Sequence, residues 1–117
     1  MLKKPFAALS FFLAISLGAG PLLAAPVKTL GFTDMSCQAW LQSKEDADQR
    51  KIYLAWIRGV LTGHNYARQS QQIPEISNGT VEVAVDRYCT EKPKSNFADA
   101  AFRLSDKLSG RNEAITK

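Results

Sequence analysis

The chain contains two cysteines, Cys37 and Cys89, and whether they are joined decides how it can fold. In an exported protein two cysteines usually form one disulfide, because the cytoplasmic reducing systems do not act there. A Cys37–Cys89 bond would close a loop of about 53 residues, which stabilises a fold by roughly 4 kcal/mol in the chain-entropy model. The alternatives are two free buried thiols or a metal pair. A zinc site is disfavoured because the single histidine, His64, leaves too few ligands.

The N-terminal residues 1–24 have the order of a secretory signal peptide. Lys3 and Lys4 precede an apolar run from Phe6 to Leu17, and small residues follow. The run of about 12 residues is shorter than the roughly 20 that span a bilayer, so a cleaved signal is favoured over an uncleaved membrane anchor. We expect cleavage after Ala24, a periplasmic location and no stable membrane anchor afterwards.

The predicted mature chain, residues 25–117, has the size of one small domain. Of the 15 basic residues, two fall in the predicted signal, so 13 remain against 11 acidic residues and the net charge is about +2. The basic residues are interleaved with acidic ones, which gives no reason to expect a nucleic-acid partner. When the carboxylates are protonated at about pH 2, the net charge approaches about +15, and this self-repulsion favours loosening of the fold.

Helical spacing predicts an all-α domain, a small four-helix orthogonal bundle tied by the Cys37–Cys89 disulfide. Asp34 or Ser36 can cap a short first helix, on which Cys37 shares a face with Trp40 and Leu41. A long second helix is expected over about residues 46–70.

Two further helices are expected in the second half of the chain. Thr80 can cap a third helix that runs to about Cys89, although the β-branched residues at 81, 83 and 85 make a strand the competing interpretation. Asn96 can cap a fourth helix that Gly110 ends, and residues 111–117 are expected to form a frayed tail.

The second predicted helix is apolar around most of its circumference, as expected for a central helix or one shared with a partner. Its candidate partner or dimer surface consists of Tyr53, Trp56, Ile57, Val60 and Leu61. A plain core helix is the alternative. Gly59 and Gly63 lie four residues apart, and we interpret them as a flat patch for close helix approach.

Motifs that carry catalytic chemistry are absent from the sequence. There is no nucleophile elbow, phosphate-binding loop or acidic cluster with metal-ligand spacing. A lone histidine such as His64 is usually a surface residue or a satisfied core residue. Asn78-Gly79-Thr80 matches a glycosylation acceptor, but we interpret it as a turn. We therefore predict no enzyme, no catalytic or metal-binding residue and no cofactor.

Two stretches around the cysteines point to a family. Residues 34–40, DMSCQAW, and residues 88–97, from Tyr88-Cys89-Thr90 to Pro93, Asn96 and Phe97, resemble the cysteine motifs of the HdeA/HdeB family of periplasmic acid-stress chaperones. The resemblance covers nearly all of the predicted mature chain. It implies a small helical fold with Cys37 and Cys89 joined, and a homodimer at neutral pH. It also implies that acid releases monomers that bind unfolding client proteins without ATP.

The middle of the chain, residues 53–65, departs from the well-studied chaperones and is more similar to a broad set of other exported relatives. It also resembles small periplasmic immunity proteins that neutralise secreted toxins. The alternative function is therefore an immunity-like or inhibitor-like module that recognises one specific protein partner at neutral pH. On that interpretation, recognition would depend on Trp56, Arg58 or Asn65.

Overall fold

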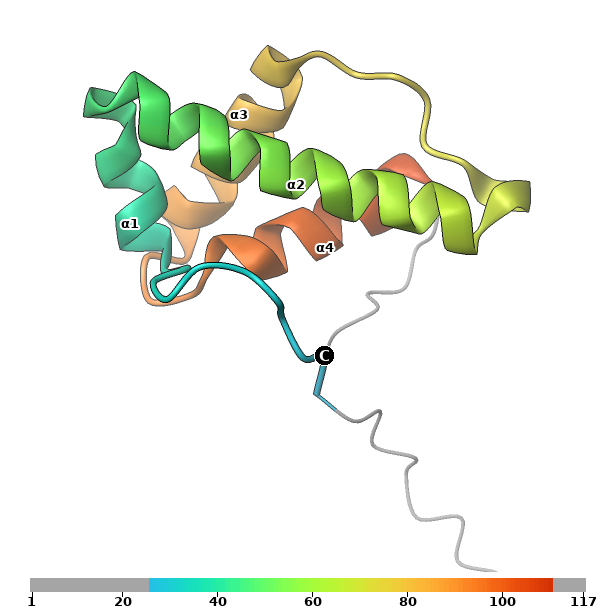
Figure 1. Ribbon diagram of the computed structural model, residues 1–117, viewed down its shortest axis with the longest axis horizontal. Helices are drawn as coiled ribbons and strands as arrows, with labels where there is room; N and C mark the ends of the chain where they lie inside the picture. Colours follow the sequence, from blue (N-terminus) through green and yellow to red (C-terminus); the bar gives the residue numbers. More distant parts are fainter. Residues whose placement is uncertain (1–25, 111–117) are drawn as a thin grey trace, which may run out of the picture.

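The computed structural model describes residues 26–110, which form a bundle of α-helices (Figure 1). The helices are α1 (Cys37–Gln42), α2 (Ala47–Ala67), α3 (Asn78–Glu91) and α4 (Phe97–Leu108), and the 3-10 turns are η1 (Ser43–Glu45) and η2 (Gln69–Gln71). Residues 26–110 contain no strand, and a single antiparallel bridge joins Ser36 to Asn96. The predicted all-α fold with one disulfide is confirmed.

Some of the predictions concern other parts of the chain. The predicted signal peptide, residues 1–24, and the predicted frayed tail, residues 111–117, lie outside the described residues. Between residues 26 and 110, none of the helices combines the length and the apolarity that a membrane crossing requires.

Three predicted helix ends are confirmed, two by side-chain hydrogen bonds and the third by a backbone angle. The side chain of Ser36 accepts from the Ala39 amide at 3.0 Å at the start of α1. The side chain of Asn96 accepts from the Asp99 amide at 2.8 Å at the start of α4. Gly110 follows α4 with a φ of +76°, a left-handed conformation that glycine adopts without steric cost.

The predicted start of the third helix is wrong. Ser77, and not Thr80, is the N-cap, since its hydroxyl accepts from the Thr80 amide at 3.1 Å. Asn78, Gly79 and Thr80 therefore form the first turn of α3. The competing strand interpretation of residues 81–85 is also wrong, because Val81 and Val85 face the core at helical spacing while Val83 is 60% exposed.

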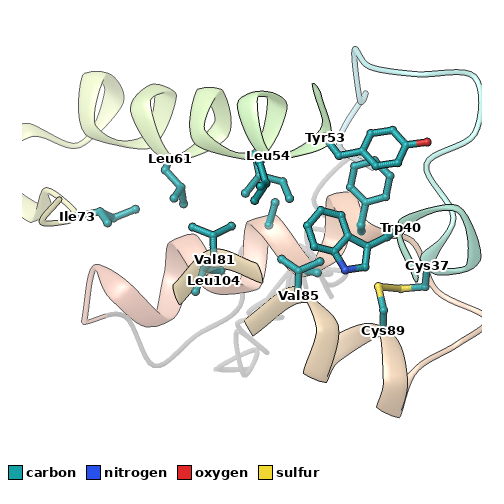
Figure 2. Close-up of a cluster of buried hydrophobic side chains, with 14 residues drawn as sticks. Cys37, Trp40, Tyr53, Leu54, Leu61, Ile73, Val81, Val85, Cys89 and Leu104 are labelled. Atoms are coloured by element: carbon teal, nitrogen blue, oxygen red, sulfur yellow. A yellow bond between two sulfur atoms is a disulfide. The ribbon is translucent and has the colours of Figure 1, made fainter. Parts of the chain in front are cut away.

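A single core lies between the helices. Figure 1 shows α1 at the N-terminal end of α2, α4 running beneath the long helix and α3 crossing behind it, where α3 contacts both α1 and α4. Cys37 of α1 and Cys89 of α3 form the disulfide at a Cα–Cα distance of 5.0 Å (Figure 2). The largest fully buried side chains are Trp40, Phe97, Ile57, Val81, Val85 and the two cysteines. The disulfide therefore lies inside the core and joins α1 directly to α3.

Candidate functional site

The structure places most of the predicted partner surface of α2 in the core (Figure 2). The exposed fractions are 7% for Tyr53, 0% for Ile57 and 7% for Leu61, whereas Trp56 and Val60 are partly buried. The first three cannot contact a partner while the protein stays folded, so their prediction as an exposed surface is corrected. These side chains fill the space between α2 and α4, and the core-helix alternative holds for them.

The segment before α1 covers Trp56. The indole Nε1 of Trp56 donates to the carbonyl of Leu30 at 2.9 Å. Phe32 packs edge-on against Tyr53 with ring centroids 5.1 Å apart. A Cβ atom at Gly31 would lie 2.5 Å from the Met35 sulfur and 3.2 Å from the indole Nε1, so a larger residue here would require the Met35 side chain to move.

Gly59 and Gly63 are not packed closely against another helix among the described residues. A Cβ atom built on either glycine meets no atom within 4 Å. Both lie on the exposed side of α2, away from the core residues Ile57 and Leu61. The prediction of close packing at these glycines is therefore wrong for this part of the chain.

The candidate recognition residues Arg58 and Asn65 bind the connection between α2 and α3. Arg58 Nη1 donates to the carbonyl of Ile76 at 2.8 Å. The Asn65 side chain donates to the carbonyl of Ile73 at 3.1 Å and accepts from its amide at 2.6 Å. Both side chains are engaged within the fold, where they hold the connection against α2.

His64 is buried beside the same connection. Its Nε2 donates to the carbonyl of Gln71 at 2.9 Å, and His64 is 8% exposed. These bonds from His64 and Asn65 draw the chain back along α2, which is why the helix ends at Ala67 and not at the predicted residue 70. His64 is thus a satisfied core residue of the kind expected for a lone histidine.

The sequence interpretation missed a buried charge cluster between the N-terminal end of α2 and α3. Arg50 of α2 is 7% exposed, and its Nη1 lies 3.3 Å from Oδ1 of Asp86 on α3. The same carboxylate oxygen accepts from the indole Nε1 of Trp40 at 2.7 Å. The guanidinium also lies 3.9 Å from the centre of the Trp40 ring.

Two further hydrogen bonds complete this cluster. Arg50 Nη2 donates to the carbonyl of Trp40 at 2.7 Å, and Arg50 Nε donates to the hydroxyl of Ser43 at 2.7 Å. Three separate elements of the chain therefore meet at one guanidinium. We call Trp40, Ser43, Arg50 and Asp86 the Arg50 cluster.

The Arg50 cluster pairs a permanent cation with a carboxylate. A guanidinium keeps its charge over the whole accessible pH range, whereas carboxylates as a class are charged only when deprotonated. A buried charge without a counter-ion costs several kcal/mol, because the interior replaces the lost water poorly. The contact between α2 and α3 therefore depends on the negative charge opposite Arg50.

Arg50 did carry a signal in the sequence. It lies in helical phase with Tyr53, Leu54 and Ile57, so a cation is placed on an apolar stripe. Arginine is almost never fully buried unless it is paired, so a cation at a core-facing position indicates a partner. Its partner Asp86 could not be identified, because the pairing depends on how α2 and α3 pack.

Two different links thus join α3 to the rest of the fold. The disulfide to α1 is covalent, and the Arg50–Asp86 pair to α2 depends on charge.

No protein-family model, curated protein or solved structure matches the chain.

Proposed function

We propose that this protein is a periplasmic acid-stress chaperone, an ATP-independent holdase that opens at low pH and binds unfolding proteins. The observation that carries the proposal is the ion pair between the buried Arg50 guanidinium and the partly exposed Asp86 carboxylate at the contact between α2 and α3. Acid strong enough to neutralise the carboxylates of the protein would leave the Arg50 guanidinium without a counter-ion inside the fold. Movement of α2 away from α3 returns this charge to water.

The residues that such an opening would expose are apolar. Tyr53, Leu54, Ile57 and Leu61 of α2 are all at most 7% exposed in the closed fold. An opened α2 would present them as one stripe, which is the kind of surface that binds unfolded chains through the hydrophobic effect. The former core thus supplies the client-binding surface.

The disulfide limits how far the chain opens. Cys37 and Cys89 are both 0% exposed and keep α1 against α3 after the charge link has gone. Meanwhile the predicted rise in net charge, from about +2 to about +15, adds repulsion that favours the open form and keeps it soluble. The expected acid state is a tethered, expanded chain and not a fully unfolded one.

Light scattering of an acid-sensitive client tests the proposal. Malate dehydrogenase is brought to about pH 2.5 and then neutralised, with and without the purified protein. We expect the protein to reduce client scattering, and small-angle X-ray scattering to show that the protein alone expands on acidification. A protein that stays compact at that pH and leaves the scattering unchanged contradicts the proposal.

A matched pair of variants connects the activity to the Arg50 cluster. Asp86→Asn removes the counter-ion of Arg50 at all pH values, so we expect weak client protection already at pH 7. Glu91→Gln removes a charge from an exposed position on the same helix and should behave like the unchanged protein. Equal behaviour of the two variants would show that overall charge, and not this pair, controls opening.

A further inference from the structure

A groove runs between α3 and α4 on the side away from the Arg50 cluster. It has a volume of about 690 Å³, and the lining residues in the described part of the chain belong to α3 or α4, apart from the N-cap Ser77. Apolar contributors from both helices include Val83, Ala84, Leu104 and Leu108. Val83 is 60% exposed, although valine on a helix is usually turned towards a core.

The charged residues that line this groove within residues 26–110 all have one sign. They are Arg87 of α3 and Arg103 and Lys107 of α4, and none of the described lining residues is acidic. The Arg50–Asp86 contact is the only salt bridge within residues 26–110, so Arg87, Arg103 and Lys107 have no carboxylate partner among these residues. Arg103 instead lies over the ring of Tyr88, 5.9 Å from its centre.

The distribution of the cations determines which ligand the groove fits. They come from both helices, and Arg103 and Lys107 lie one helical turn apart on α4. A fatty acid carries one anionic head and would neutralise only one end of such a groove. A second copy of the same groove would bring like charges together in a symmetric contact. An amphipathic helix with acidic residues on both sides of its apolar stripe matches the apolar floor and both basic walls.

The length of the groove suits a short helix. The stretch from Thr80 to Tyr88 on α3 is nine residues, which span about 12 Å of helix, or roughly two turns. The small side chains of Ala84 and Ala100 allow another helix to approach. We propose that this groove docks an acidic amphipathic helix of another protein at neutral pH, with the protein closed.

This inference does not depend on the proposed chaperone function. Docking uses the closed fold and the outer faces of α3 and α4, whereas the chaperone proposal uses the opened core face of α2. Measurements at pH 7 without any aggregating client therefore test docking alone.

Fluorescence anisotropy of a labelled synthetic peptide measures the docking. The peptide contains two heptads with leucine at positions a and d and glutamate at e and g, and its counterpart carries lysine in place of glutamate. We expect saturable binding of the glutamate peptide, weakening with added salt, and no saturable binding of the lysine peptide. Binding of both peptides, or of neither, overturns the proposal.

Charge-reversal variants locate the binding. Arg103→Glu together with Lys107→Glu should weaken peptide binding by about tenfold or more, because two attractive contacts become repulsive. Lys44→Glu with Lys51→Glu changes the net charge equally at exposed positions outside the groove and should leave binding unchanged. Equal losses in the two variants overturn the proposal, since they indicate non-specific attraction.

An uncharged pair of variants tests the apolar floor. Val83→Ser should weaken binding, whereas Ile52→Ser, at a half-exposed apolar position on α2 outside the groove, should not. Circular dichroism checks that each variant stays helical. Displacement of the peptide by laurate, together with no effect of Val83→Ser on peptide binding, would overturn the proposal in favour of an amphiphile as the ligand. A doubled molecular mass of the protein in solution, with the groove covered, would overturn it in favour of a second copy.

Discussion

The Nη1 atom of Arg50 lies 3.3 Å from the Oδ1 atom of Asp86, and this contact is the only ion pair among residues 26–110. It is supported on one side by the Trp40 indole, which donates to the same oxygen at 2.7 Å. One carboxylate thus compensates a buried guanidinium and also orients a buried indole. The stability of the contact between α2 and α3 depends on that carboxylate.

Replacement of Asp86 by Asn should destabilise the protein by about 1–3 kcal/mol at pH 7, because it leaves the Arg50 charge without a counter-ion. The figure is below that for a fully buried pair, since the Asp86 side chain is 36% exposed and partly screened by water. Urea unfolding followed by tryptophan fluorescence measures the loss. Glu91→Gln is the control and should change the free energy of unfolding by less than about 0.5 kcal/mol. A loss equal to that of the control would show that the pair contributes nothing to stability.

Two isoleucines of α2 should respond very differently to truncation. Ile57 is 0% exposed and Ile52 is 50% exposed, although they lie five residues apart on one helix. We expect Ile57→Ala to cost about 2–5 kcal/mol, through lost burial and a residual cavity, and Ile52→Ala to cost less than about 1 kcal/mol. Thermal unfolding followed by circular dichroism measures both. Similar costs would show that this face of α2 is not the core face in solution.

Much of the fold could be predicted from local patterns. The N-caps Ser36 and Asn96 and the helix end at Gly110 depend on interactions within a few residues, so the sequence determines them locally. The predicted start of α3 is Thr80, but Ser77 is the N-cap, and its hydroxyl accepts from the Thr80 amide. Both residues carry a hydroxyl, and the local pattern does not show which of them lies one residue before the first helical turn.

The candidate site was harder to predict, because its residues meet only through packing. Helical periodicity identified the apolar residues of α2 but could not show whether they faced a core or a partner. The groove between α3 and α4 likewise depends on how two helices pair, since Arg87 and Arg103 are 16 positions apart in the sequence. Local patterns therefore give the elements, and the three-dimensional packing gives the site.

Removal of the disulfide should destabilise the protein strongly. The Cys37→Ser, Cys89→Ser double variant frees a chain segment of 52 residues and should lower the free energy of unfolding by about 4 kcal/mol. Urea unfolding at pH 7 measures this loss. In acid, small-angle X-ray scattering should show the variant more expanded than the unchanged protein, because no tether then holds α1 to α3. Equal dimensions of the two proteins at about pH 2.5 would show that the disulfide does not limit opening.

The start of α1 should titrate with Asp34. Hydrogen bonds from the side chain and then the backbone amide of Ser36 hold the pKa of Asp34 below its ordinary value of 3.8. A carboxyl group with a lowered pKa in the folded state contributes stability that is fully present above about pH 3.8 and is lost as the pH falls through the lower folded value.

Ser36→Ala should therefore raise the pKa of Asp34 towards 3.8, measured by NMR titration of its carboxyl carbon. It should also cost about 1 kcal/mol of stability at pH 7, because α1 loses its N-cap. Thr33→Ala removes a neighbouring exposed hydroxyl and should change neither quantity. An Asp34 pKa that stays equally low in the Ser36→Ala variant would show that the hydroxyl of Ser36 does not stabilise the charged carboxylate.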